Sequence, residues 1–205
     1  MDAQKKSLIA SERDEGARGA WRAAEADTPA EAYVFVDECG CRTNMTPRYA
    51  RAPKGERAYG RAPRNHHRNT TLVAALTVGG MGAAMTIEGA IDGEAFVGYL
   101  RQFLVPSLLP GQVVVLDNLN VHKNARVRPL VEGAGCRLVY LPSYSPDLNP
   151  IEHAFSKIKN HVRRAEPRDH NAVVSTLGAA MARVTARDAA GWVRHCGYPL
   201  PRYPP

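Results

Sequence analysis

The stretch QVVVLD, residues 112–117, decides the fold, because it places four apolar residues in succession directly before an aspartate. An uninterrupted apolar run of this kind is typical of a central strand that is covered on both faces. A second candidate strand, EAYVFVDE at residues 31–38, also runs from apolar residues into acids. We therefore expect two central strands that carry Asp37 and Asp117 where their apolar runs end.

The segments around these two strands predict a mixed α/β sheet. Further strands are expected at 70–78, 84–90 and 136–141, and helices at about 92–105, 124–134, from 151 onward, 169–184 and 186–196. The first of these helices is expected to bury Phe96, Leu100, Phe103 and Leu104. Three early strands indicate an antiparallel meander, and the later alternation indicates parallel additions with helical crossovers. The predicted fold class is α/β, with a five-stranded sheet of three antiparallel strands plus two parallel ones, flanked by helices.

Length and composition fit one domain with an appendage. The chain has 205 residues, of which 44% are hydrophobic. We divide it into a helical lead-in arm (1–30), a core domain (31–197) and a flexible tail (198–205). Four scattered cysteines without a CxxC pair argue for a reducing cytoplasm and against a zinc cluster. The sequence shows neither an apolar run of membrane-span length nor a signal peptide.

Positive charge is concentrated in one segment, residues 42–68, which we call the basic segment. It holds eight basic residues and a single acid, so it accounts for the whole net charge of +7. Concentrated positive charge is the electrostatic footprint of a polyanion, which favours nucleic acid as the partner. A solvated, solubilising loop is the alternative. Within the segment we assign Arg61, Arg64 and Arg68 to DNA contact.

The proline-rich stretch SYSPDLNPIE, residues 143–152, fixes the approach to a third carboxylate, that of Glu152. The helix that follows has an apolar stripe made of Ile151, Phe155, Ile158 and Val162. The stretch alone also fits a purely structural role. In that interpretation Asn149 is the N-cap, Pro150 is the first helical residue and Glu152 completes a capping box.

Taken together, Asp37, Asp117 and Glu152 predict a divalent-metal site. Ligands of α/β sheets bind at the carboxyl ends of strands, so the two aspartates converge if their strands are neighbours. Three carboxylates repel each other, and a hard cation such as Mg²⁺ or Mn²⁺ removes that repulsion. Two such ions about 4 Å apart can activate a water and stabilise the leaving oxygen of a phosphodiester. Taken singly, each aspartate is more often a turn or cap residue.

Three motifs, in chain order, resemble the catalytic blocks of mariner-like DDE transposases, most closely those of the bacterial insertion-sequence branch. They are VFVDECG (34–40), VVLDNLNVHK (114–123) and LPSYSPDLNPIEHAFSKIK (141–159). Between Asp117 and Glu152 lie 34 residues, the spacing that marks this branch. The resemblance covers about residues 31–197. It implies a ribonuclease H-like fold, Mg²⁺ dependence and cut-and-paste DNA chemistry, with Asp37, Asp117 and Glu152 as catalytic metal ligands.

The resemblance also implies partners. These are double-stranded DNA, as transposon ends and target, and a second copy of the chain in a homodimer on that DNA. Full-length members of the family carry N-terminal helix-turn-helix domains, and this sequence shows none. We therefore expect the catalytic half of a split or frameshifted transposase, with a separately encoded helix-turn-helix half. Its expected location is the bacterial cytoplasm, at the nucleoid.

Four further residues are expected to contact DNA near the carboxylates: His122, Lys123, Lys159 and Arg163. His122 would contact DNA near the scissile phosphate or orient Asp117, and a packing or helix-cap histidine is the alternative. Lys159 and Arg163 continue the helical line of Glu152 and could track a phosphate backbone. A solvated helix face is the alternative for both.

The expected reaction is DNA cleavage at a transposon end, followed by attack of the freed 3′-hydroxyl on target DNA. Two other functions stay open. A ribonuclease H-like nuclease without strand transfer would prefer RNA–DNA hybrids. An inactive DNA-binding remnant would bind DNA without Mg²⁺-dependent nicking.

Overall fold

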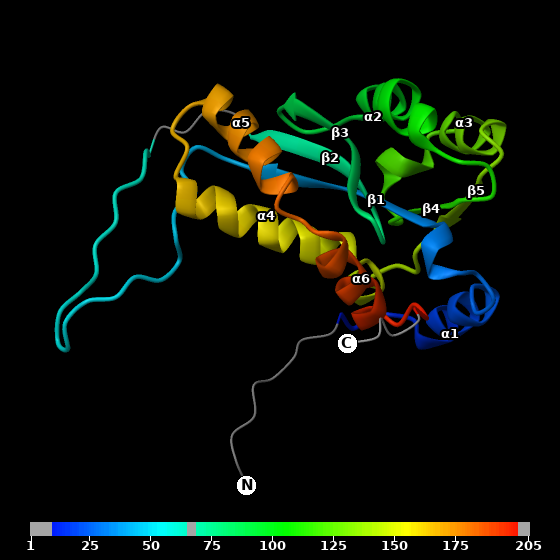
Figure 1. Cartoon of the computed structure of the whole chain (residues 1–205), viewed down its shortest axis with the longest axis horizontal. Helices are drawn as coiled ribbons and strands as arrows, with labels where there is room; N and C mark the ends of the chain where they lie inside the picture. The colour runs from blue at the N-terminus through cyan, green and yellow to red at the C-terminus, as the bar shows by residue number, and fades with distance from the viewer. Residues whose placement is uncertain (1–9, 65–68, 201–205) are drawn as a thin grey trace, which may run out of the picture.

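The computed structural model describes residues 10–64 and 69–200, and its centre is a mixed five-stranded sheet in the order β3-β2-β1-β4-β5 (Figure 1). The strands are β1 (Tyr33–Cys41), β2 (Thr70–Thr77), β3 (Gly80–Glu88), β4 (Val113–Leu116) and β5 (Arg137–Tyr140). β1, β2 and β3 pair antiparallel, whereas β4 and β5 are added parallel to β1. The sheet predicted from the sequence is confirmed.

Helices cover both faces of this sheet. They are α1 (Glu15–Ala24), α2 (Gly93–Tyr99), α3 (Val127–Gly133), α4 (Ile151–Ala165), α5 (His170–Met181) and α6 (Ala186–His195). Successive side chains of β1 point to opposite faces of the sheet and pack in two separate cores. Phe35 packs in the cluster with α4, α5 and α6, and Val36 packs in the cluster with α2 and α3. All four residues of β4 are buried, which confirms the central strand expected from its apolar run.

Two local predictions are wrong. Asp37 does not end its strand, because β1 stays paired with β2 as far as Cys41. The parallel pairing of β1 with β4 does end at Phe35, so Asp37 lies just beyond it. Phe103 is 39% exposed instead of buried. It lies in a π-helical turn, η2 (Leu100–Leu104), that follows α2 and changes the direction in which its side chains point.

The two ends of the described chain meet in one core. The rings of Trp21 in α1 and Tyr198 lie edge to face, with centroids 6.0 Å apart. Tyr198 is buried and donates a hydrogen bond of 2.7 Å to the Leu148 carbonyl. The predicted flexible tail therefore begins too early, since Tyr198 belongs to the core, and residues 201–205 lie outside the described part. No helix among the described residues is long and apolar enough to cross a membrane.

Candidate active site

Three acidic residues from separate elements line one cavity of about 360 Å³. Asp37 comes from β1 and Asp117 directly follows β4, its neighbour in the sheet. Glu152 comes from the first turn of α4. The loop between β5 and α4 forms much of the cavity's lining. No three His, Cys, Asp or Glu side chains in the described chain are gathered closely enough to hold a metal ion. The three carboxylates thus line the same cavity but are not close enough together to bind one metal ion.

The carboxylate of Asp37 is held from two sides. Its Oδ1 accepts the N–H of Glu38 at 2.7 Å, and its Oδ2 accepts the side-chain amide of Asn149 at 2.8 Å. The residue is only 6% exposed. Burial, together with the negative charges of Glu38, Asp117 and Glu152, raises the pKa of Asp37 to about 8, against the lowering effect of the Glu38 N–H. This position therefore favours a bound proton or cation.

Asn149 has a different role from the one that its local sequence suggests. Its side chain is buried against Asp37 and does not cap α4, which follows Pro150 without a side-chain cap bond. The capping-box interpretation is therefore wrong, since no capping hydrogen bond forms and the Glu152 side chain is exposed. The amide of Asn149 satisfies a buried carboxylate, which is worth more than a bond to a backbone N–H at a helix end.

His122 connects Asp117 to a second acid. Its Nδ1 lies 2.5 Å from Asp117 Oδ1, and its Nε2 lies 3.0 Å from Glu38 Oε2. Asp117 Oδ1 also accepts the N–H of Leu119 at 3.0 Å. Burial lowers the pKa of His122, but hydrogen bonds and charges from Asp117 and Glu38 outweigh it and raise the pKa to about 9. The ring is therefore an imidazolium that donates to both carboxylates.

The expected contact of His122 with DNA is wrong for this structure, because the side chain is fully buried and both nitrogens are occupied. Its other expected role, orienting Asp117, agrees with the geometry. Glu38 was missed in the sequence, although it directly follows Asp37. In a strand, successive side chains point to opposite faces, so Glu38 reaches His122 on the face opposite Asp37.

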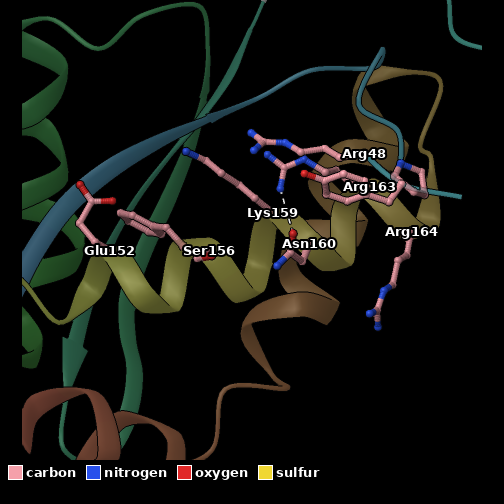
Figure 2. A pocket seen from close by; sticks show the side chains of 10 residues that line it. Arg48, Glu152, Ser156, Lys159, Asn160, Arg163 and Arg164 are labelled. Atoms are coloured by element: carbon pink, nitrogen blue, oxygen red, sulfur yellow. Dashed lines mark hydrogen bonds between the residues drawn. The ribbon is translucent and has the colours of Figure 1, made fainter. Parts of the chain in front are cut away.

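The predicted DNA-contact residues lie in three places. Lys159 and Arg163 line a groove of about 740 Å³ beside α4, and Glu152 lines the same groove (Figure 2). Lys123 is exposed at the end of a short 3-10 turn, η4 (Asn120–Lys123). Arg61 and Arg64 are exposed on the basic segment, whose described part, residues 42–64, extends away from the body after β1 (Figure 1). Arg68 lies outside the described residues.

A comparison with protein families supports the same span of the chain. The model described as DDE superfamily endonuclease matches residues 32–173, which contain all three cavity acids. A comparison with curated proteins gave no match.

Solved structures with a similar fold include several of the Mos1 transposase. The pre-cleavage Mos1 transpososome matches with a TM-score of 0.72 at 14% identity. The match covers 96% of this chain and 64% of the Mos1 chain. The Mos1 mariner paired end complex with Mn has a TM-score of 0.72 at 15% identity, with the same two coverages. The catalytic domain of Mos1 mariner transposase has a TM-score of 0.63 at 13% identity and covers 94% and 92%. The chain thus spans less than two thirds of the Mos1 chains in those two complexes, and its fold is ribonuclease H-like.

Proposed function

Because the chain belongs to the DDE superfamily endonuclease family, we propose that it cleaves DNA with Asp37, Asp117 and Glu152 as its catalytic residues. The observation that carries the proposal is that these three acids line a single cavity inside the span matched by the family. Transposition, meaning cleavage at an element's end followed by strand transfer into target DNA, is the reaction we propose. The chain's similarity in fold to Mos1 transposase supports that choice.

The donor set fits a pair of hard divalent cations. Carboxylate oxygens select Mg²⁺ or Mn²⁺ over softer metals, and the raised pKa of Asp37 marks a site where positive charge is favoured. Mos1 paired end complexes with Mg and with Mn support the same ions for this chain. Held by Asp37, Asp117 and Glu152, such ions would supply water activation and stabilisation of the leaving oxygen.

The remaining residues of the site position these carboxylates. Asn149 fixes one oxygen of Asp37, and His122 fixes one oxygen of Asp117. Asp117 Oδ2 accepts no hydrogen bond from the described residues, so it is free to act as a ligand. Glu152 is exposed at the junction of the cavity and the α4 groove, where a phosphodiester can reach it. The site therefore combines two fixed aspartates with one accessible glutamate.

The proposal extends to partners. The Mos1 structures include complexes named as a transpososome and a strand transfer complex, which supports DNA ends and target DNA as substrates here. A homodimer on DNA and a separately encoded helix-turn-helix half are the partners that we propose for end recognition.

The test is nicking of supercoiled plasmid in Mg²⁺, with Ca²⁺ as the arm that reports binding alone. Asp37→Asn, Asp117→Asn and Glu152→Gln should each reduce nicking by 100-fold or more. Glu132→Gln removes an exposed carboxylate that is paired with Arg128 and is not among the residues that line the cavity, so this variant should nick at the wild-type rate. Wild-type nicking by any of the three active-site variants would refute the assignment. Preferred cleavage of an RNA–DNA hybrid would indicate the ribonuclease H-like nuclease, and DNA binding without nicking would indicate the inactive remnant.

A further inference from the structure

The groove beside α4 extends from Glu152 along the helix to Arg163 (Figure 2). One wall is the exposed side of α4, and the other is formed by residues 47–49 of the basic segment. Glu152 lines both this groove and the active-site cavity, so a polymer that passes Glu152 can continue along the helix. Lys159 and Arg163, seven and eleven residues later, lie about 10 and 16 Å further along the helix axis.

Three cations of the groove have no carboxylate partner within hydrogen-bonding distance among the described residues. Arg48, Lys159 and Arg163 extend toward the side of α4 on which the Glu152 carboxylate lies, whereas Arg164 points away (Figure 2). Within residues 10–64 and 69–200, none of Arg48, Lys159 and Arg163 forms an ion pair with a carboxylate. Arg163 donates only to the neutral side chain of Asn160, at 3.0 Å. Cations gathered in this way repel each other until an anion binds between them.

The segment wall adds an aromatic surface. Tyr49 lines the groove and is nevertheless 91% exposed. The base of the segment is held by Arg168, which donates to the carbonyls of Thr43 at 2.9 Å and Met45 at 3.3 Å on the outgoing side. It also donates to the Arg61 carbonyl at 3.3 Å on the returning side. The base of the wall that carries Tyr49 is thereby anchored to the connection between α4 and α5.

We propose that this groove binds one DNA strand in single-stranded form, with its phosphates along Lys159 and Arg163 and a base stacked on Tyr49. The proposal rests on the proposed function and specifies its substrate. Inside a duplex both faces of each base are covered by neighbours, so Tyr49 would find a free base face only at a duplex end. An unpaired strand offers the faces of its bases, and cationic grooves with exposed aromatic residues are typical of single-strand binding. The distance from Glu152 to Arg163 accommodates at most about five stacked nucleotides.

The experiment measures binding of the full chain to fluorescent oligonucleotides without divalent metal, so that no cleavage occurs. A six-nucleotide single strand is compared with a duplex of the same sequence. Tyr49→Ala should weaken single-strand binding about tenfold, the typical effect of removing one stacking aromatic residue, and Tyr49→Phe should retain it. Tyr59→Ala is the matched control, because Tyr59 is also on the basic segment and 89% exposed but is not among the residues that line the groove.

A 2-aminopurine base in the oligonucleotide adds an independent signal. Its fluorescence should be quenched on binding to the wild type and to Tyr49→Phe, and much less on binding to Tyr49→Ala. Equal losses for Tyr49→Ala and Tyr59→Ala, or tighter binding of the duplex than of the single strand, would overturn the proposal. The plasmid-nicking assay reports the proposed function separately, since a chain that nicks normally can still fail this binding test, and the reverse.

Discussion

At the scale of single residues, Asp37 is the acid of the site whose negative charge is least favoured by its surroundings. It is nearly fully buried, and the negative charges of Glu38, Asp117 and Glu152 act on it. Among the described residues, the N–H of Glu38 and the side-chain amide of Asn149 donate to it and offset that environment. Its pKa of about 8 means that the folded chain binds a proton there that the unfolded chain releases near pH 4. The stability contributed by this proton is fully present below the unfolded pKa and is lost as the pH rises through about 8.

Asp37→Asn should therefore raise the melting temperature in the absence of divalent metal, and more so at high pH. An asparagine carries no charge to repel Glu38, Asp117 and Glu152. We expect a gain of at least about 1 kcal/mol at pH 8.5, or about 2–4 °C for a chain of this size. The wild type should lose stability between pH 5 and pH 9, and the variant should lose less. Identical melting curves across this range would contradict the assigned environment of Asp37.

His122 is a positioning residue, and its removal should change how nicking depends on Mg²⁺ if it acts through Asp117. His122→Ala leaves Asp117 and Glu38 without their shared donor, which should cost about 1–3 kcal/mol of stability. Nicking should fall tenfold or more at a fixed Mg²⁺ concentration and recover in part as Mg²⁺ is raised, because a loosely held Asp117 binds metal more weakly.

Lys123→Ala, the exposed neighbour of His122, is the control for this measurement. It should leave the dependence of nicking on Mg²⁺ unchanged. An unaltered Mg²⁺ dependence in His122→Ala would show that the histidine does not act through Asp117.

At the scale of elements, the sequence predicts the strands better than their connections. The apolar runs and the alternation of strand and helix predict three antiparallel strands and two parallel ones. They do not predict that β1 and β4 are neighbours, on which the shared cavity of Asp37 and Asp117 depends. Helix and strand periodicity is local, so it can be read from neighbouring residues. The contacts that complete the site join distant positions: Asn149 to Asp37 across 112 residues and His122 to Glu38 across 84. No local pattern encodes such pairs.

The lead-in helix α1 shows the same limit. Arg18 is buried and donates to both oxygens of Asp147, at 3.0 and 2.6 Å, across 129 residues. Asp147 lies in η5 (Pro146–Leu148), the short 3-10 turn just before Asn149 and α4. The sequence indicated a helical lead-in arm, and in the structure α1 of this arm contacts the loop of the active site.

Arg18→Met should therefore weaken the loop while keeping the apolar stem of the side chain. We expect a loss of about 1–3 kcal/mol, below the value for a fully buried ion pair because Asp147 is half exposed. Nicking should fall in parallel, since Asn149 and Glu152 follow this turn. Arg22→Met, a change in the same helix that leaves Arg18 and Asp147 intact, is the control. An Arg18→Met variant as stable and as active as the wild type would mean that α1 does not support the loop.

At the scale of the whole molecule, the surplus positive charge lies in the basic segment, whereas the three proposed catalytic carboxylates lie in the body of the domain. The basic segment carries a formal charge of +7, and the rest of the chain is neutral in sum. The described part of the segment, residues 42–64, extends from the body after β1 (Figure 1), and within that part only residues 47–49 line the α4 groove. Exposed arginines of this kind contact phosphates, which contribute affinity but carry no sequence information. DNA binding by the chain alone should therefore be mainly electrostatic.

This separation predicts that affinity for DNA depends on salt far more than on sequence. Titrations of an inverted-repeat duplex and a scrambled duplex should give similar dissociation constants, both of which rise steeply with salt. Replacing Arg61, Arg64 and Arg68 together by Gln should flatten the salt dependence on both duplexes, by up to about three units of log–log slope if each contacts one phosphate. Replacing Arg126 and Arg128, which already pair with Glu94 and Glu132, should change the slope much less.

A preference for the repeat of 100-fold or more, about 2.7 kcal/mol, would mean instead that this chain reads bases itself. The basic segment would then be an element of specificity, because phosphate contacts alone cannot distinguish the two duplexes.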